Sequence, residues 1–256
     1  MRRVQNGRVE VSSAPARKKF QGYMSETPLL IRIADVRGNK GLETLREAFH
    51  EYCSILEKED HREENYVHYK LAFLLLKNRR FSVKNINDFL IVYNDEVKGA
   101  NHGGKRCSDG EVGQFISGAM SASKARKLKL TTKTLEFKLE DFGIGNTKDI
   151  EVDGDVGELA FCNMESGLVE INGNAKEGLG YCMEGGRIIL RGDLILSELE
   201  MTSNYYFCTG YHMTGGEIHI EGNIVTPYET AEVERLLEEA AEGGKIYHKG
   251  KLVVDK

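Results

Sequence analysis

Residues 150–223 repeat with a period of about 19 residues, and this repeat constrains the fold more than any other feature of the chain. Three segments align as IEVDGDVGELAFCNMESGL, VEINGNAKEGLGYCMEGGR and IILRGD…CTGYHMTGGE, and a fourth begins as IHIEGN and stops. Gly154, Gly173 and Gly192 follow one another at equal intervals, whereas Gly222 comes later than this interval predicts. One repeat therefore carries an insertion of about 11 residues. A fixed period of this kind predicts stacked coils of chain instead of a conventional globular core.

Each repeat begins with two apolar residues that are two positions apart. The pairs are Ile150 and Val152, Val169 and Ile171, Ile188 and Leu190, and Ile218 and Ile220. A spacing of two places both members of a pair on one face of a strand, so we expect these side chains to share one interior. The residues between them are expected to face outward.

Glycines follow the strands at regular places, which predicts two sets of corners. The expected corner residues are Gly154, Gly173, Gly192 and Gly222 at the first corner, and Gly167, Gly186 and Gly216 at the second. Glycine permits both a positive φ and a close approach of another backbone. The residue after each first-corner glycine is Asp or Asn, which we expect to tolerate a left-handed backbone and to hydrogen-bond its own turn.

The glycine pattern resembles a known family. The spacing G-x-x-x-x-G-x-G-x-x-x-x-G-G at Gly173–Gly186, followed by a β-branched strand, is similar to the GXGXG β-helix of the C-terminal domain of the glutamate synthase large subunit. It is also similar to one of the subunits of formylmethanofuran dehydrogenase. The resemblance covers residues 150–223, under a third of the chain, and the insertion Leu194–Tyr205 departs from it. It implies a right-handed β-helix that spaces and couples catalytic parts and holds no catalytic residues itself.

Apolar spacings outside the repeat predict four helices before it and a cap after it. The helices are expected at about 42–58, 63–77, 84–97 and 110–123, with a strand at 28–36. Alternation from Leu128 to Leu139 predicts a first, irregular coil. A helix at about 230–242 and a hairpin about His248–Gly250 follow the repeat.

The sequence therefore predicts an α+β fold with an N-terminal helical region, a short right-handed parallel β-helix, and a C-terminal cap of a helix and a hairpin. The expected segments are a disordered basic arm at 1–23, a mainly helical domain at 24–125, a GXGXG-like β-helix at 126–228 and the cap at 229–256.

Composition narrows the cellular setting. The chain has no apolar run that could span a membrane and no secretory signal at its start, so we expect a cytoplasmic protein that does not bind membranes. Five scattered cysteines without a C-x-x-C favour reduced thiols. A net charge of −5 disfavours a general nucleic-acid binder. A nucleic-acid contact remains a second alternative, through the arm and the cluster Lys124, Arg126, Lys127 and Lys129.

Few side chains form a pattern that suggests chemistry. Cys182 and His212 occupy equivalent places in successive repeats, but two ligands do not complete a zinc site, and a packed cysteine is the simpler explanation. Glu151, Glu170 and Asp153 face outward, as expected of a solvated sheet. We therefore assign no catalytic, metal-binding or cofactor-binding residue and expect no cofactor.

The insertion points to an interface. Insertions in stacked repeats often lie on a binding face. Tyr205, Tyr206, Phe207 and Tyr211 concentrate aromatic side chains there, and such side chains anchor interfaces or pack against capping helices. We interpret the protein as a non-enzymatic structural or protein-interaction module with a protein partner or self-association. The main alternative is an enzyme, or a subunit of one, with a site between the helices and the repeats near Cys182, His212 and Tyr211.

Overall fold

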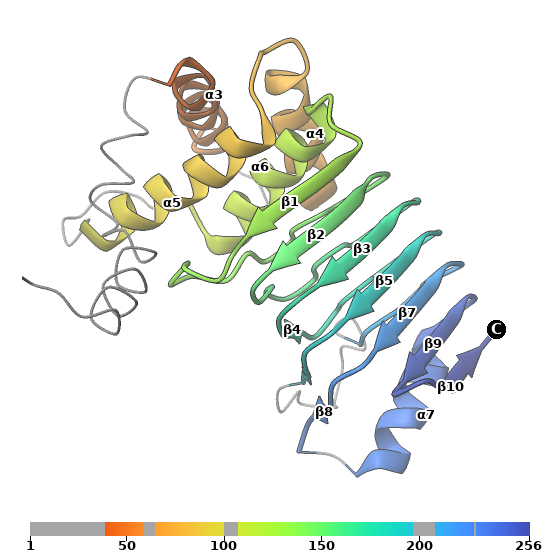
Figure 1. Cartoon of the computed structure of the whole chain (residues 1–256). Helices are drawn as coiled ribbons and strands as arrows, with labels where there is room; N and C mark the ends of the chain where they lie inside the picture. The colour runs from red at the N-terminus through yellow and green to blue at the C-terminus, as the bar shows by residue number, and fades with distance from the viewer. Residues whose placement is uncertain (1–38, 59–64, 100–106, 197–207, 228) are drawn as a thin grey trace, which may run out of the picture. The chain divides into compact units, whose positions relative to one another are not determined.

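A computed structural model describes most of the chain after Gly38. The described residues are 39–58, 65–99, 107–196, 208–227 and 229–256. The chain divides into two compact units, Met1–Gly38 and Asn39–Lys256, and every described residue belongs to the second. That unit is a mixed α/β structure in which five described helices accompany a mostly parallel sheet (Figure 1). Within the described ranges, no helix has both the length and the hydropathy that a membrane span requires.

Four helices precede the sheet and confirm the helices expected from the apolar spacings, each with ends close to the expected ones. They are α3 (Lys40–Leu56), α4 (Asn65–Leu76), α5 (Val83–Gly99) and α6 (Asp109–Ala122). Helix α6 begins with a capping box, in which Ser108 Oγ accepts from Glu111 N at 3.2 Å and Glu111 Oε2 accepts from Ser108 N at 2.6 Å. The strand expected at 28–36 and the basic arm at 1–23 lie outside the described residues.

Aromatic rings join three of these helices. Phe49 of α3 contacts Phe115 of α6 and Phe89 of α5, with ring centroids 4.9 and 5.3 Å apart. Helix α4 crosses α6 at Gly118, where an added Cβ would lie 2.6 Å from Phe73 N. The large aromatic rings bury much apolar area between α3, α5 and α6. The absence of a side chain at Gly118 lets the backbones of α4 and α6 come into contact, so the four helices form one packed layer.

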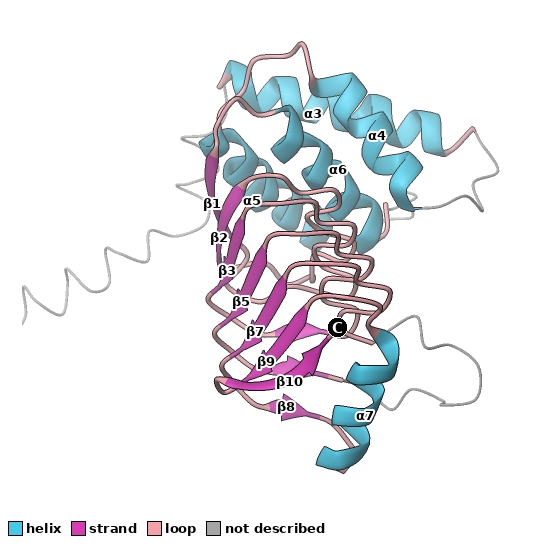
Figure 2. Cartoon of the chain, turned by 90° about the vertical axis from the view of Figure 1, so that its right-hand side faces the viewer, coloured by secondary structure: helices cyan, strands magenta, loops and turns pink. Residues whose placement is uncertain are grey.

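The main sheet has seven strands in the order β1-β2-β3-β5-β7-β9-β10. The strands are β1 (Lys127–Thr131), β2 (Asp149–Asp153), β3 (Leu168–Ile171), β5 (Arg187–Leu190), β7 (Glu217–Ile220), β9 (Lys245–His248) and β10 (Lys251–Asp255). The first six are parallel neighbours, and β10 returns antiparallel to β9, which confirms the expected hairpin. Figure 2 shows these strands side by side along one face of the repeats.

The register places equivalent residues of successive repeats next to one another. Leu128, Ile150, Val169, Ile188, Ile218 and Ile246 form one continuous row of paired residues, and each is at most 2% exposed. A second, three-stranded parallel sheet repeats this order with β4 (Ala175–Lys176), β6 (Leu194–Ile195) and β8 (Ile224–Val225). The apolar pairs therefore face inward, as their spacing predicts.

Of two sequence expectations about the ends of the repeat, one is wrong and the other is confirmed only in part, since β1 pairs in parallel with β2 as the expected first coil. The repeat does not stop at β7, because β9 pairs with it in parallel and places Gly244 in line with Gly216. Helix α7 (Thr230–Ala240) lies within that last repeat, between β8 and β9, and its extra residues obscure the period in the sequence. The alternating segment Leu135–Leu139 forms no strand, since Glu136 N donates to Asn94 Oδ1 of α5 at 2.7 Å and is not available to the sheet.

Side chains cover the first edge of the sheet. Asn87 of α5 donates from Nδ2 to Lys129 O at 2.9 Å and accepts from Thr131 N at 2.8 Å through Oδ1. The amide group therefore pairs with β1 as a neighbouring strand would. An edge strand with unpaired backbone groups invites aggregation, so Asn87 protects the outer edge of β1. At the other end, the β9–β10 hairpin covers β7 and leaves β10 as the outer strand.

The two sets of corner glycines differ in backbone conformation. Gly167, Gly186 and Gly216 have φ between 86° and 93°, a backbone that side chains strain. Gly173, Gly192 and Gly222 have no such φ, but an added Cβ would lie 2.1–2.3 Å from the backbone of the preceding repeat. Gly167, Gly186 and Gly216 are also closely stacked, since an added Cβ would lie 2.4–2.8 Å from a backbone carbonyl oxygen of the preceding repeat. Close stacking therefore requires glycine at both corners, and the second corner requires it for conformation as well. Gly154 is the first-corner glycine that also has a positive φ, of 126°.

The Asp and Asn residues that follow the first corner form a ladder between repeats, which we call the Asx ladder. It consists of Asp155, Asn174, Asp193 and Asn223, and each Oδ1 of the first three accepts the backbone N–H of the next member at 2.7–2.9 Å. None of the four has a positive φ. The expectation that they bond their own turns is therefore wrong, because their acceptors reach the adjacent repeat.

Candidate functional site

Three residues project from one corner of successive repeats. Asn163, Cys182 and His212 have φ of 51°, 51° and 54°, and each backbone N–H donates at 2.8 Å to a carbonyl of the next repeat. Left-handed backbone is uncommon outside glycine, although Asn and His adopt it more readily than most residues. The repeated conformation places Cys182 and His212 one above the other, as their alignment predicts.

Aromatic rings line the same corner. Tyr181 and Tyr211 stack with centroids 5.7 Å apart and planes 13° apart, and the ring of His212 meets Tyr211 at 4.0 Å. His212 Nδ1 contacts Glu242 Oε1, which follows α7 in the chain. We call Tyr181, Cys182, Tyr211, His212 and Glu242 the corner ladder. Tyr181 and Tyr211 are half-buried and His212 is exposed, so the ladder presents an ordered aromatic surface to solvent.

The electrostatics of the corner ladder do not favour a nucleophile. Burial raises the pKa of the Cys182 thiol, and the carboxylate of Glu242 raises it further, while a hydrogen bond with Tyr181 opposes them. Burial also raises the pKa of Tyr181 to about 12, with Cys182 contributing. Because the thiolate is the reactive form of cysteine, Cys182 stays largely protonated near neutral pH. The ladder therefore resembles a packed surface more than a catalytic centre.

The remaining cysteines lie partly in the repeats and partly in the helical region. Cys162 is buried and Cys208 is half-buried, and burial raises the pKa of both thiols. Cys53 of α3 forms a disulfide with Cys107, with Cα atoms 6.9 Å apart. The expectation of five reduced thiols is therefore wrong for this pair. The two residues are 54 positions apart, so only the packing of the helices brings them together.

The outward carboxylates of the sheet are engaged in ion pairs. Glu151 pairs with Lys129 at 2.5 Å, and Glu170 pairs with Arg191 at 3.1 Å. Among the described residues, no three His, Cys, Asp or Glu side chains are placed to hold a metal ion. This face has the character of a solvated sheet with cross-strand ion pairs.

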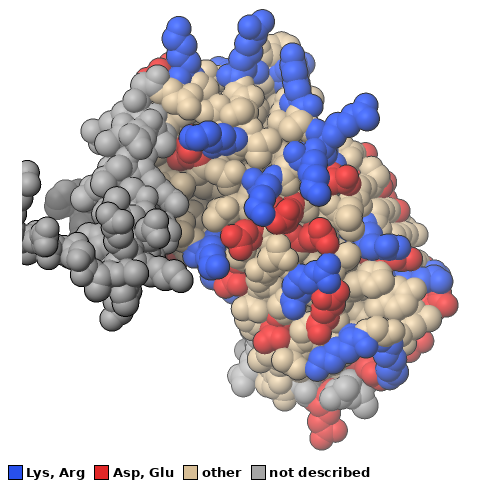
Figure 3. Space-filling view, viewed as in Figure 1, with Lys and Arg blue, Asp and Glu red and all other residues tan. Residues whose placement is uncertain are grey.

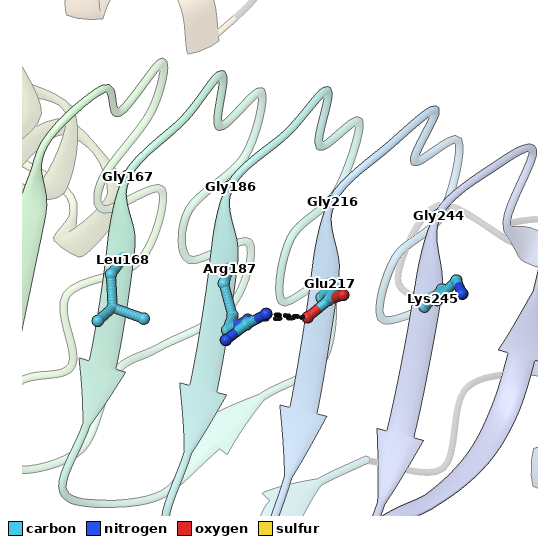
Figure 4. A pocket seen from close by; sticks show the side chains of 8 residues that line it. All are labelled: Gly167, Leu168, Gly186, Arg187, Gly216, Glu217, Gly244 and Lys245. Carbon is cyan, nitrogen blue, oxygen red and sulfur yellow. Dashed lines mark hydrogen bonds and ion pairs between the residues drawn. The ribbon is translucent and has the colours of Figure 1, made fainter.

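A shallow groove of about 630 Å³ runs along the second set of corners. Its lining, drawn in Figure 4, is Gly167, Leu168, Gly186, Arg187, Gly216, Glu217, Gly244 and Lys245. Arg187 and Glu217 form an ion pair at 2.7 Å across it. The glycine carbonyls accept hydrogen bonds within the stack, as Gly186 O does from Glu217 N at 3.0 Å. The floor of the groove is therefore backbone, and the Arg187–Glu217 ion pair crosses it. The lining offers no free general acid or base.

The structure covers only part of the interface expected from the sequence. Tyr205, Tyr206 and Phe207 lie outside the described residues, whereas Tyr211 belongs to the corner ladder. Tyr181 and Glu242 were not expected. Tyr181 could have been found by alignment, because it stands one residue before Cys182 as Tyr211 does before His212. Glu242 could not have been found in this way, because it comes close to the corner only after the chain has passed through α7.

Comparisons of the chain with protein families, curated proteins and solved structures find no match. The corner ladder must therefore be interpreted from its own geometry and charge.

Proposed function

We propose that this protein is a non-enzymatic structural or protein-interaction module, and that its partner, or a second copy, binds at the corner ladder. The observation that carries this proposal is the stacked, half-buried pair Tyr181 and Tyr211 on successive repeats. Tyrosine anchors interfaces because it adds apolar area with little loss of side-chain freedom and keeps a polar hydroxyl. The rings are already held in place by their neighbours, so binding would cost little further ordering.

The scaffold under this surface supports the same proposal. We propose that the repeats form a right-handed β-helix of the GXGXG type, similar to that of the glutamate synthase domain. The continuous inward row from Leu128 to Ile246 and the second parallel sheet are the features that support it. A β-helix gives a rigid corner whose side chains keep a spacing of about 4.8 Å per repeat. Such a surface suits recognition of a partner of fixed shape.

The test is affinity purification of the tagged full chain from its host, together with light scattering of the purified protein. We expect a stoichiometric partner or a stable homo-oligomer. The Tyr181→Ala/Tyr211→Ala variant should lose at least about 10-fold in affinity, because removing an anchor residue typically costs more than about 1 kcal/mol.

A matched control comes from the sheet face. His219 and Tyr247 also stack on neighbouring strands, with centroids 4.4 Å apart, and both are half-buried. The His219→Ala/Tyr247→Ala variant should keep the partner. A monomer without a partner, or equal losses in both double variants, would contradict the assignment of the interface to the corner ladder.

A further inference from the structure

Charge is unevenly divided along the chain. Residues 1–135 hold 25 Lys and Arg against 16 Asp and Glu, whereas residues 136–256 hold 10 against 24. Figure 3 shows Lys and Arg side chains gathered over the upper part of the molecule, where the helices lie, with acidic side chains more frequent over the repeats. The net charge of the whole chain conceals this separation.

The packing of α5 against β1 concentrates part of this positive charge. Asn87 of α5 binds β1 at Lys129 and Thr131, and Asn94, two turns later, binds Glu136. The helix and the chain through β1 therefore run in the same direction, as Figure 1 shows. The residues that begin α5 and those that lead into β1 consequently lie at the same end.

Six exposed cations belong to these two beginnings, and we call them the basic rim. They are Arg80, Lys84, Lys124, Arg126, Lys127 and Lys129. Lys84 pairs with Asp88 at 2.7 Å and Lys129 with Glu151 at 2.5 Å. Within the described part of the chain, the other four have no carboxylate within ion-pair distance. The rim therefore keeps an excess of positive charge.

The rim is not needed to stabilise the end of α6, which is the structural role such residues often have. A helix C-terminus carries about −0.5 of a charge. Lys148 already fills that place, because its ammonium donates to Met120 O at 2.7 Å, to Ser121 O at 3.2 Å and to Ser123 O. Lys124, Arg126 and Lys127 are thus left for another use.

We propose that the basic rim binds the phosphate backbone of double-stranded nucleic acid. The rim consists of charged side chains, and its only aromatic neighbour in the described turn before α5, Phe81, is half-buried. Single-stranded binding needs exposed rings for base stacking, and a protein interface has an apolar centre. Anionic membranes also attract clustered cations, so the experiment below includes vesicles. Contacts to duplex phosphates need only positioned cations. The binding is independent of base sequence and of the corner ladder.

The test measures fluorescence anisotropy of a labelled duplex of about 20 base pairs, as DNA and as RNA, with the full chain between about 50 and 200 mM salt. We expect both duplexes to bind, with affinity falling steeply as salt rises. The Lys124→Gln/Arg126→Gln/Lys127→Gln variant should weaken binding at least about 10-fold at low salt. It should also reduce the salt slope by about 2–3, or roughly one per phosphate contact.

The control removes the same number of cations from the opposite end of the sheet. The Lys249→Gln/Lys251→Gln/Lys256→Gln variant should bind as the unaltered chain does. Three results would overturn the proposal: no duplex binding at low salt, equal losses in the two triple variants, or binding to phosphatidylserine-containing vesicles but not to duplex. Because the corner ladder is intact in both variants, partner capture reports separately on the proposed function.

Discussion

At the scale of single residues, the Asx ladder explains why Asp or Asn follows each first-corner glycine. The side chain accepts a backbone N–H of the next repeat, so it holds two repeats in register. Short Asp and Asn side chains suit this role, because their acceptor stands close to the backbone. The motif was visible in the sequence, but the direction of its hydrogen bonds was not.

Asp155 should make part of the stability depend on acid pH. Burial raises the pKa of this carboxyl, but the Asn174 N–H and the Lys138 ammonium outweigh burial and lower it overall. A carboxyl whose pKa is lowered in the folded state stabilises the fold at a pH above its ordinary pKa of about 4. This contribution is lost as the pH falls through the folded-state pKa. We therefore expect Asp155→Asn to reduce the loss of thermal stability below about pH 4, measured by circular dichroism from pH 7 downward. The same pH profile in both proteins would contradict this role.

Cys182 should react slowly with alkylating reagents at neutral pH. Burial raises its pKa above the ordinary thiol value of about 8.5, so the thiolate is scarce at pH 7. Mass spectrometry after iodoacetamide treatment should show modification that is slow at pH 7 and accelerates as the pH is raised. Cys182→Ser identifies the modified peptide. Rapid labelling at pH 7 would revive the alternative of a cysteine enzyme.

At the scale of elements, the packing of α5 on β1 decides how the sheet begins. Asn87 supplies both a donor and an acceptor to the outer edge of β1. Tertiary contact therefore replaces a missing strand at this edge. The apolar stripe of α5 predicted a helix that packs, but one polar residue on it determines where the helix packs.

Asn87→Ala should destabilise the protein by about 1–3 kcal/mol, because it leaves a partly buried donor and acceptor of β1 without partners. Urea unfolding measures the change, and hydrogen exchange at Thr131 should accelerate. Asn78→Ala, at an exposed position before α5, is the control and should change stability by less than about 0.5 kcal/mol. Equal effects of the two substitutions would show that the edge is protected by other contacts.

A stacked corner glycine should tolerate alanine less well than the glycine in the β9–β10 turn. A Cβ at Gly173 would lie 2.3 Å from the backbone of Gly154, whereas a Cβ at Gly250 meets nothing within 4 Å and suffers only from a φ of +77°. We expect Gly173→Ala to cost at least about 3 kcal/mol in urea unfolding and Gly250→Ala about 1–2 kcal/mol. The reverse order would mean that backbone conformation, not stacking, limits the first corner.

At the scale of the whole molecule, the chain itself covers the outer edge of β1 and the edge of β7. Helix α5 covers β1, and the β9–β10 hairpin follows β7. The strands β1 and β7 therefore do not depend on a second subunit for cover, and β10 is left as the outer strand. Self-association would use another surface, such as the outer edge of β10 or the corner ladder.

Truncation after Glu242 should convert the protein into a self-associating form. It removes β9 and β10 and leaves the backbone groups of β7 unpaired, and such edges pair with other chains. Light scattering should report oligomers or aggregates of the truncated chain. The full chain that carries Tyr181→Ala/Tyr211→Ala, measured at the same concentration, should remain smaller. A monodisperse truncated monomer would show that β7 needs no cover.

The sequence predicted the helices and the inward row of the repeats, because both follow from short-range spacing of apolar residues. It missed that β9 joins the parallel stack, because α7 interrupts the period before that strand. It also missed the Cys53–Cys107 disulfide, which joins segments that are distant in the chain. The cluster of four cations from Lys124 to Lys129 was visible in the sequence, but the contribution of Arg80 and Lys84 to the basic rim was not, because it depends on the packing of α5 against β1. In the candidate site, Cys182, Tyr211 and His212 came from the repeat itself, whereas the contribution of Glu242 depends on how the chain returns after its detour.

The insertion between β5 and β7 leaves the pairing of the neighbouring strands unchanged. Ile188 still pairs with Ile218, and Leu194 with Ile224, as Val169 pairs with Ile188 across a step of ordinary length. The stack therefore constrains where a departing segment returns but not how long the segment is. Evolution can lengthen, shorten or exchange the segment at this point without altering the neighbouring strands, and a protein engineer can use the same point to graft a foreign domain.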